Sequence, residues 1–267
     1  MGARFFDRTE PATTSDHFIE FRNVSKAFDD HLVLDDVSFF VDPGETCVIM
    51  GRSGVGKSVT LKHILGFLKP DSGRVLVAGE DITDWTEDQL AEIRRRVTMV
   101  FQSGALFDSL TVAENIAFPL EKRSDLTAEQ KDARVAELAE MLEVTDVLDK
   151  LPSELSTGTK RSVAIARALA QDPEAILYDE PTTMVDPLMA AYTGDLILGL
   201  KEKFHKTSVV VTHDTHLAKK LADRVVFLHE GRVAYFGPWA GFVAAPEPFL
   251  RNFLRQDELI PELDVTT

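Results

Sequence analysis

The sequence predicts an α/β protein: a parallel sheet covered by helices, an antiparallel β-subdomain at the N-terminal end, and a helical subdomain inserted into the middle. Three observations lead to this fold class. Short apolar runs of β type alternate with longer stretches of helical periodicity. A glycine-rich loop pattern at residues 51–58 follows one apolar run and precedes a helical stretch. Strand signals then disappear between residues 103 and 153.

Five short apolar runs are the predicted strands of the parallel sheet. They cover residues 45–50, 97–101, 175–178, 208–212 and 224–228. Cys47, inside the first run, is expected to be a small buried apolar residue. Two earlier segments, residues 18–28 and 33–41, alternate more loosely and end in the turn signal Asp42-Pro43-Gly44. We expect these two segments to form the antiparallel layer.

The helical subdomain is expected at about residues 103–160. Thr127 and Gln130 are spaced like a capping box, in which each side chain bonds to the backbone N–H of the other residue. Apolar side chains then follow at helical spacing, at Val135, Leu138, Met141 and Leu142. The interruption of the sheet pattern by helices therefore predicts an insertion rather than a second α/β unit.

The insertion lies inside one expected domain at residues 17–240. Residues 1–16 mix charged, hydroxyl and proline residues without an apolar core, which predicts a flexible leader. Residues 241–267 are punctuated by proline and end in an acidic stretch. We interpret them as a C-terminal extension, either a tail or a segment that binds a partner.

The net charge argues against a nucleic-acid-binding protein. The chain has 29 Lys and Arg residues against 44 Asp and Glu residues, so its formal net charge is -15 at pH 7. Such a field repels polyanions, and neutralising phosphates needs a basic face. No run approaches the ~18 continuous apolar residues of a membrane span. We therefore expect any role at a membrane to depend on a partner protein.

Residues 51–58 match a phosphate-binding loop, between an apolar strand and a helix. Glycines let successive backbone N–H groups face one anion, and the helix N-terminus adds partial positive charge. Lys57 would reach the β- and γ-phosphates of a nucleotide, and the Ser58 hydroxyl would bind Mg²⁺. The predicted nucleotide-binding residues of this segment are Gly51, Ser53, Gly54, Val55, Gly56, Lys57, Ser58 and Val59.

Polar residues at the ends of the other predicted strands supply the rest of a hydrolytic site. Asp179 is placed to hold the Mg²⁺ shell, and Glu180 to act as general base or to orient the attacking water. Gln102 and His213 could sense a γ-phosphate, or each could be a loop residue with its hydrogen bonds satisfied locally. Phe28 could stack on an adenine ring, or it could face the core from a strand.

A second motif identifies the family that the chain resembles. Residues 155–161 read Leu-Ser-Thr-Gly-Thr-Lys-Arg, and Ala-Ile-Ala-Arg-Ala-Leu follows at residues 164–169, ahead of Asp179-Glu180. In this order the motifs resemble those of ATP-binding-cassette (ABC) ATPases, over about residues 17–240. The resemblance implies the ABC ATPase fold of P-loop NTPases, with a RecA-like core. It also implies a head-to-tail dimer, either a homodimer or a pseudo-symmetric pair, with two ATP molecules in the interface.

The resemblance also assigns roles to single residues. It implies that Ser156 and Gly158 complete the phosphate site of the partner subunit. It implies Phe28 as the adenine-stacking ring, Gln102 as a catalytic residue and Mg²⁺ ligand, and His213 as the residue that assists Glu180. Asp186 would belong to the D-loop.

A narrower resemblance concerns the cargo. Residues 101–115, 118–120 and 246–254 are similar to the ATPase subunit of Mla and Mce-type phospholipid transporters. This implies a peripheral subunit on the cytoplasmic face of the inner (plasma) membrane, bound to an integral-membrane permease. The permease would work with an MCE-domain lipid-binding protein.

Two departures from the family motif leave alternatives open. Thr157 stands where a glycine is usual and Thr159 where glutamine is usual. Because a β-branched residue is costly at positive φ, we infer that residue 157 does not need that conformation. The alternatives are an ATPase of a polar-solute transporter, a regulatory subunit that hydrolyses ATP poorly, and a soluble cassette ATPase of DNA repair or translation.

Overall fold

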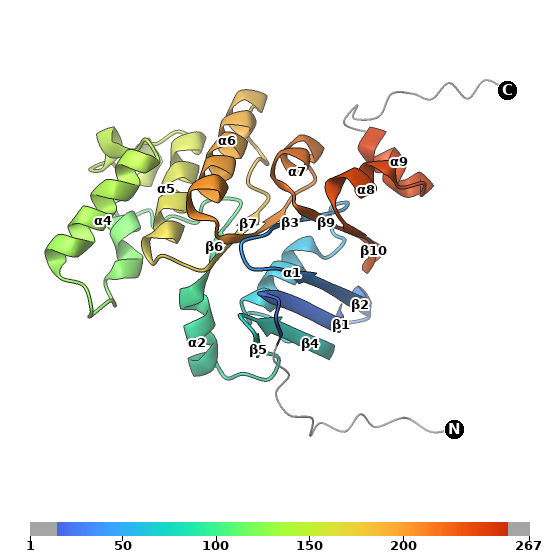
Figure 1. Ribbon diagram of the computed structural model, residues 1–267. Coiled ribbons are helices and arrows are strands. Elements are labelled where there is room, and N and C mark those ends of the chain that lie inside the picture. Colours follow the sequence, from blue (N-terminus) through green and yellow to red (C-terminus); the bar gives the residue numbers. More distant parts are fainter. Residues whose placement is uncertain (1–14, 256–267) are drawn as a thin grey trace.

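The computed structural model describes residues 15–255, which form two sheets with helices between and around them (Figure 1). The strands are β1 (Ile19–Phe28), β2 (His31–Val41), β3 (Thr46–Met50), β4 (Ser72–Val77), β5 (Glu80–Asp81), β6 (Val97–Val100), β7 (Ala175–Asp179), β8 (Thr207–Val211), β9 (Arg224–His229) and β10 (Arg232–Gly237). The helices are α1 (Lys57–Ile64), α2 (Glu87–Arg96), α3 (Val112–Ala117), α4 (Ala128–Met141), α5 (Thr157–Ala170), α6 (Pro187–Phe204), α7 (Thr215–Leu221), α8 (Trp239–Ala244) and α9 (Pro248–Arg255). Short 3-10 turns are η1 (Phe118–Leu120), η2 (Thr145–Val147) and η3 (Pro152–Glu154).

The central sheet has the strand order β10-β9-β3-β8-β7-β6. Five of its strands run parallel to one another: β9, β3, β8, β7 and β6. The sixth strand, β10, lies at one edge and is antiparallel to β9. The register aligns Ile49, Val211 and Asp179 across three adjacent strands. The loops that follow β3, β7 and β8 therefore leave the sheet at one edge, where α/β proteins build their binding sites.

All five strands predicted for this sheet are present, and their ends differ from the prediction by at most one residue. Phe101 is one such difference: β6 ends at Val100 and the exposed ring of Phe101 begins the following turn. The prediction missed β4, β5, β10 and α2. Helix α2 has mostly charged residues and buries only Leu90 and Ile93, so its apolar periodicity is weak.

The N-terminal sheet is antiparallel, as predicted. Its strand order is β2-β1-β4-β5, and β1 pairs with both β2 and β4. Phe21 lies opposite Phe39, and the two rings stack at 4.6 Å between centroids. The cross-strand aromatic pair fixes which face of this sheet turns toward α1.

Helix α1 lies between the two sheets (Figure 1). Its buried Leu61 and Ile64 belong to one apolar cluster with Ile19 and Val75 of the N-terminal sheet. Side chains from one face of the central sheet, Cys47 and Ile49 among others, complete this cluster. Cys47 is fully buried, which confirms that it is a core residue. This packing holds the first turn of α1 at the end of β3.

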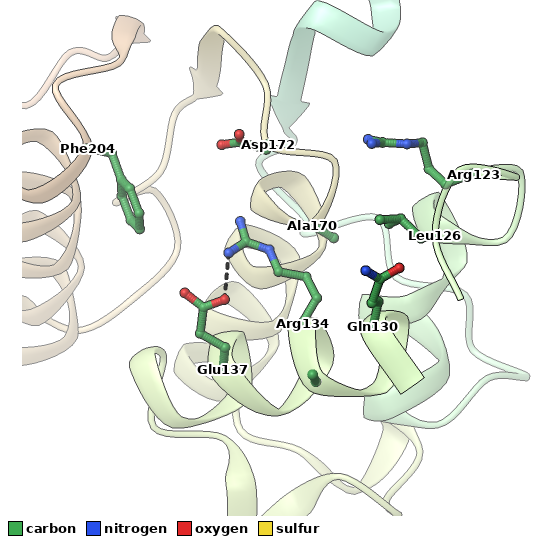
Figure 2. A pocket seen from close by; sticks show the side chains of 9 residues that line it. Arg123, Leu126, Gln130, Arg134, Glu137, Ala170, Asp172 and Phe204 are labelled. Carbon is green, nitrogen blue, oxygen red and sulfur yellow. Dashed lines mark hydrogen bonds and ion pairs between the residues drawn. The ribbon is translucent and has the colours of Figure 1, made fainter. Parts of the chain in front are cut away.

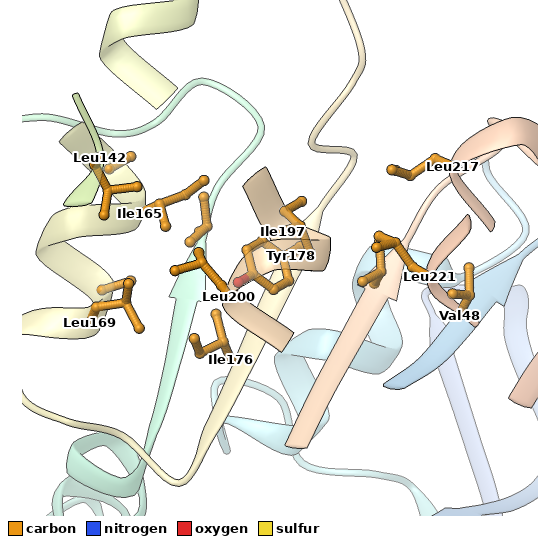
Figure 3. Close-up of a cluster of buried hydrophobic side chains, with 14 of the residues drawn as sticks. Val48, Leu142, Ile165, Leu169, Ile176, Tyr178, Ile197, Leu200, Leu217 and Leu221 are labelled. Carbon is orange, nitrogen blue, oxygen red and sulfur yellow. The ribbon is translucent and has the colours of Figure 1, made fainter. Parts of the chain in front are cut away.

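The opposite face of the central sheet is covered by α5, α6 and α7 (Figures 1 and 3). Alternate residues of the same strands point there, because successive side chains of a strand face opposite sides of a sheet. Val48, Ile176 and Tyr178 meet side chains of the three helices in this second cluster. The helical subdomain thus shares its core with the sheet through α5.

The inserted helical subdomain is built on α3, α4 and α5, which pack together. The predicted capping box is confirmed at the start of α4: the Thr127 N–H donates to Gln130 Oε1 at 2.8 Å, and the Gln130 N–H donates to Thr127 Oγ1 at 3.3 Å. Val135, Leu138 and Leu142 are buried, in agreement with the helical spacing.

Candidate functional site

The phosphate-binding loop connects β3 to α1 and is shaped by glycines. Gly51 has φ 145° and Gly56 has φ 107°, a region that side-chain-bearing residues rarely adopt. A Cβ atom at Gly51 would lie 2.5 Å from the Leu228 carbonyl oxygen, and one at Gly56 would lie 2.7 Å from Leu34 Cδ2. The loop therefore packs tightly against β9 and β2 at two points. Gly54, between them, borders open space.

The first two residues of α1 carry the polar groups of this loop. Lys57 is only 7% exposed, and its ammonium donates to the carbonyl oxygens of Gly51 at 2.9 Å and Arg52 at 3.2 Å. Ser58 Oγ donates to Asp179 Oδ1 at 2.9 Å. The loop backbone thus holds the Lys57 ammonium in a buried position rather than at the protein surface. Of the other predicted residues, Ser53 is exposed and Val55 and Val59 are half-buried.

Asp179 ends β7 directly opposite the loop. Its contact with Ser58 brings together two oxygen donors, which suit a hard cation such as Mg²⁺. Burial raises the pKa of the Asp179 carboxyl above its ordinary value, partly offset by the Ser58 hydrogen bond, while the charge of Glu180 raises it further. A bound cation would favour the charged carboxylate, so this donor set fits Mg²⁺.

Glu180 receives three cationic or donor groups on its carboxylate. His213 Nδ1 lies 2.9 Å from Oε2, and Thr183 Oγ1 donates to the same oxygen at 3.1 Å. Lys57 Nζ lies 3.4 Å from Oε1. The residue has φ 47°, and its N–H donates to the Val211 carbonyl oxygen at 2.9 Å. The structure therefore brings Lys57, Glu180 and His213 together, as a hydrolytic site at this sheet edge requires.

Gln102 and Phe28 lie at the periphery of this arrangement. Val100 is paired with Tyr178, so Gln102 and Glu180 each lie two residues beyond this pair, at the same edge of the sheet. Gln102 is exposed in the turn that ends with Gly104. Phe28 ends β1 and is 41% exposed, so the alternative of a core-facing ring is wrong. Lys26 Nζ lies 5.7 Å from the centre of its ring.

The signature motif forms the start of α5. Ser156 caps the helix: its Oγ accepts a hydrogen bond from the Thr159 N–H at 3.1 Å and lies 2.8 Å from the Thr159 hydroxyl. Thr157 is the first helical residue, with an ordinary negative φ, as inferred from its branched side chain. Gly158 is buried, and a Cβ there would collide with the Met189 side chain. Among the hydrogen bonds of residues 15–255, none joins Ser156 to residues 51–58.

Two groups in this region, Thr183 and Arg161, were not identified from the sequence. Thr183 donates to Glu180, and Arg161 of α5 donates to the Thr183 carbonyl oxygen. Asp186 caps α6 by accepting a hydrogen bond from the Met189 N–H at 3.0 Å; the sequence predicted Asp186 but not this contact. For the contact between Thr183 and Glu180, the only sequence signal is the i to i+3 spacing of these two residues. The Arg161 contact joins residues 22 positions apart and had no local signal.

Two hollows lie away from these residues. One, of about 480 Å³, is bounded by α4, the end of α5 and Phe204; there Arg134 pairs with Glu137 at 2.8 Å (Figure 2). It holds none of the predicted site residues. The other is a groove of about 360 Å³ between the α1–α2 region and the helical subdomain. It is lined by four exposed rings and two half-buried cations: Phe67, Phe101, Phe107 and Phe118, with Arg94 and Arg167.

Comparisons with known proteins agree with this geometry. The family model described as ABC transporter matches residues 34–183. The chain is 34% identical to a Mycobacterium leprae protein named probable ribonucleotide transport ATP-binding protein mkl, over 91% of this chain and 70% of that protein. It is 37% identical to the methionine import ATP-binding protein MetN of Brucella abortus, over 95% of this chain and 68% of that protein. The chain belongs to the ABC transporter family.

Solved structures lead to the same fold for this ABC ATPase. A dimeric post-hydrolysis state of the ATP-binding cassette MJ0796, bound to ADP and Pi, is 34% identical with a TM-score of 0.75, and covers 82% of this chain and 98% of its own. The cbiO1 protein of Clostridium perfringens is 27% identical with a TM-score of 0.79, and covers 91% of this chain and 96% of its own. The predicted ABC ATPase fold is confirmed.

The chain is therefore the ATP-binding subunit of an ABC transporter, which binds ATP with Mg²⁺ and couples ATP hydrolysis to transport. A DNA-repair or translation ATPase is disfavoured, because the named relatives are transport proteins. Within residues 15–255, no helix combines the length and apolar character that a membrane span requires.

Proposed function

We propose that this ABC ATPase drives phospholipid transport of the Mla/Mce type. The observation that carries the ATPase chemistry is the cluster of Lys57, Ser58, Asp179 and Glu180 at one sheet edge. The lipid cargo is supported by the resemblance of residues 101–115, 118–120 and 246–254 to that transporter branch. The subunit would act at the cytoplasmic face of the inner membrane, on a permease that works with an MCE-domain lipid-binding protein.

The residues of the cluster have separate tasks in this proposal. Ser58, Asp179 and Gln102 would hold Mg²⁺, which would screen the phosphate charge, and Lys57 and the loop N–H groups would bind the β- and γ-phosphates. Glu180 orients the attacking water and accepts its proton. His213 and Thr183 hold the Glu180 carboxylate through hydrogen bonds of 2.9 and 3.1 Å. Phe28 supplies an exposed ring for the adenine base.

The proposal needs a second copy of the chain or a close homologue. Ser156 and Gly158 belong to α5 and do not bond to the phosphate loop of their own chain within the described residues. A head-to-tail dimer would bring them to the partner's nucleotide, where the α5 N-terminus would face the γ-phosphate. The dimeric MJ0796 structure, bound to ADP and Pi, supports this arrangement.

The groove beside the helical subdomain is the proposed contact for the permease. Phe107 and Phe118 pack at 4.4 Å between ring centres, and Arg167 lies 5.5 Å from the centre of the Phe107 ring. Arg167 also donates to the carbonyl oxygens of Gly104 and Ala105, close in sequence to Gln102. An amphipathic cytoplasmic helix of the permease would cover these rings. Movement of that helix would then reach the Mg²⁺ site through the Gln102 turn.

The domain division follows the same proposal. We assign the ATPase domain to residues 17–240, with the helical subdomain at about residues 103–160, and a partner-binding extension to residues 241–267. Within the extension, Leu250 and Leu254 of α9 are buried against the ATPase domain, and Phe253 packs 4.9 Å from Phe227. The predicted leader at residues 1–16 lies almost wholly outside the described residues.

The cargo is tested by purifying the tagged chain from its native membranes in mild detergent and identifying co-eluting proteins and lipids by mass spectrometry. A permease with an MCE-domain protein and bound phospholipid is the expected result. A permease with a solute-binding protein would instead favour a polar cargo, the alternative suggested by relatives named for methionine import and ribonucleotide transport. Steady-state phosphate release then separates a motor from a regulatory subunit that hydrolyses ATP poorly.

A further inference from the structure

Among the residues that the structure describes, no carboxylate pairs with the buried guanidinium of Arg161. Arg161 lies in the first turns of α5 and is 6% exposed. Its Nη2 donates to the Thr183 carbonyl oxygen, and Nη1 has no hydrogen-bond partner within residues 15–255. Burying a charge is unfavourable unless strong partners compensate, and an apolar residue of similar size is commonly the more stable choice. A neutral carbonyl is weak compensation, so stability alone does not explain this arginine.

The carbonyl that Arg161 binds belongs to a residue that contacts the reacting centre. Thr183 Oγ1 donates to Glu180 Oε2 at 3.1 Å. The same oxygen lies 2.9 Å from His213 Nδ1. Arg161 of α5 thus bonds to the backbone of Thr183, and the side chain of Thr183 bonds to the Glu180 carboxylate. Thr183 therefore connects α5 to Glu180.

A second contact ties the same two segments together. The terminal methyl group of Met189, in the first turn of α6, packs directly against Gly158, at the place where a Cβ atom of residue 158 would lie. Gly158 and Arg161 lie three residues apart, on neighbouring turns of one helix. The start of α5 is thus attached at two points to the segment from Glu180 to Met189. A shift of α5 along or across this segment must move Thr183, because interiors are close-packed.

We propose that Arg161 is a positioning residue that links the two nucleotide sites of the dimer. This inference rests on the proposed head-to-tail arrangement, in which Ser156 and Gly158 contact the partner's nucleotide while Glu180 acts on the nucleotide of its own chain. Engagement of α5 by the partner's γ-phosphate sets the position of Arg161. Arg161 in turn sets the position of Thr183, and the Thr183 hydroxyl aligns Glu180 for attack by water.

The first test replaces Arg161 by methionine, which keeps an unbranched apolar stem but removes the guanidinium. Phosphate release by the full-length chain, in complex with its membrane partners where these are required, is measured across ATP concentrations. We expect kcat to fall about tenfold with ATP affinity changed less than about twofold, since an aligning contact is lost. The Hill coefficient for ATP should fall from about two toward about one, because the coupling between sites is removed.

Arg134→Met is the matched control. Arg134 also donates to a backbone carbonyl, that of Leu169 at 3.0 Å, but it lines the hollow beside α4 (Figure 2), whose lining includes neither Glu180 nor Thr183. It should leave kcat and the Hill coefficient at the parent values. Equal kinetic losses in Arg134→Met and Arg161→Met would overturn the inference, because they would reveal a general effect of removing an arginine that binds a backbone carbonyl.

A second variant keeps the inference testable if Arg161→Met does not fold. Thr183→Val leaves the carbonyl that Arg161 binds and removes only the hydroxyl that reaches Glu180. Thr183→Val should reproduce the loss of kcat, whereas Thr183→Ser, which keeps a hydroxyl, should restore the parent kcat. The double variant Thr183→Val with Arg161→Lys should lose no more kcat than the more impaired of its two single variants. Parent-like kinetics in Thr183→Val, or additive losses in the double variant, would overturn the link.

Failure of the link is distinguishable from failure of the proposed dimer. If the parent chain hydrolyses ATP with a Hill coefficient of about one and stays monomeric with ATP, the head-to-tail arrangement itself is wrong. If the parent is cooperative and dimeric but Arg161→Met and Thr183→Val keep that cooperativity, the dimer stands and the Arg161 link is wrong.

Discussion

At the scale of single residues, the contacts of the Glu180 carboxylate would align it as the proposed general base without neutralising it. One oxygen faces His213 and Thr183, and the other faces Lys57 at 3.4 Å. Lys57 is itself held by two backbone carbonyl oxygens. An incoming phosphate would draw the Lys57 ammonium away from Glu180, because a phosphate carries the larger negative charge. Nucleotide binding would then free the carboxylate for the attacking water.

The separate proposed roles of Lys57 and Glu180 predict that one variant loses ATP binding and the other loses ATP turnover. Lys57→Ala should abolish ATP binding, since it removes the buried cation of the phosphate loop. Glu180→Gln should bind ATP like the parent but lower turnover by at least about 10²-fold, the usual contribution of a general base. Fluorescent-nucleotide binding and phosphate release measure the two effects separately. A Glu180→Gln protein that hydrolyses ATP at the parent rate would exclude Glu180 as the base.

At the scale of secondary-structure elements, α5 tolerates an altered signature because its first turn is capped by side chains. The Ser156 hydroxyl accepts the Thr159 N–H, and the Thr159 hydroxyl lies 2.8 Å away. Thr157 takes an ordinary helical conformation. The two threonines therefore leave intact the Ser156 and Gly158 positions that the proposed dimer uses.

Thr157→Gly should accordingly keep ATP turnover similar to the parent or raise it, with a small loss of helix stability of about 0.5–1 kcal/mol. Phosphate release and urea unfolding of the same preparation check both parts. Ser156→Ala is the contrasting variant, since it removes the cap and the proposed trans contact together. Loss of activity in Thr157→Gly would mean that the threonine is a specific adaptation of this signature.

Helix α1 contains a buried histidine that makes the stability of the fold depend on pH. His63 is fully buried beneath the N-terminal sheet, with Nδ1 2.8 Å from the Val59 carbonyl oxygen and Nε2 unpartnered within residues 15–255. Burial lowers the pKa of His63 below its ordinary value. The folded protein therefore binds this proton less readily than the unfolded chain, and stability must fall as pH drops below about 6.5.

His63→Leu should remove this part of the pH dependence. Urea unfolding at about pH 7 and pH 5.5 should show a smaller loss of unfolding free energy in His63→Leu than in the parent. His31→Leu, at an exposed histidine, should keep the parent's pH dependence. An identical loss in parent and His63→Leu would show that His63 does not titrate over this range.

Element prediction succeeded where apolar runs are buried on both faces, as in the central parallel strands. It failed for β10, whose residues are mostly half-buried at a sheet edge and which is reached through a tight turn with positive φ at Glu230 and Gly231. The site was predictable as a set of strand-end residues, because a parallel sheet gathers them at one edge. The contact of Arg161 with Thr183 was not, since it depends on how α5 packs against a loop 22 residues further along.

At the scale of the whole molecule, a single chain holds the two halves of a site in different places. The phosphate loop and Glu180 lie at the edge of the central sheet, whereas Ser156 lies at the start of α5 in the helical subdomain. Helix α1 packs on one face of the central sheet and α5 on the other, in two separate apolar clusters, so the fold of one chain holds the phosphate loop and Ser156 apart. The proposed head-to-tail dimer resolves this separation with two composite sites.

Mixing two inactive variants tests that arrangement directly. Lys57→Ala should inactivate the phosphate loop of its own chain, and Ser156→Arg should block the signature that the chain offers to its partner. In a mixed dimer, both defects fall in one composite site and the other site is intact. If the two sites act independently, phosphate release should therefore recover to roughly a quarter of the parent rate. Coupling through Arg161 would reduce this recovery. Complete inactivity of every mixture, with mixed dimers verified by differential tags, would contradict composite sites, because each chain would then need both groups of its own.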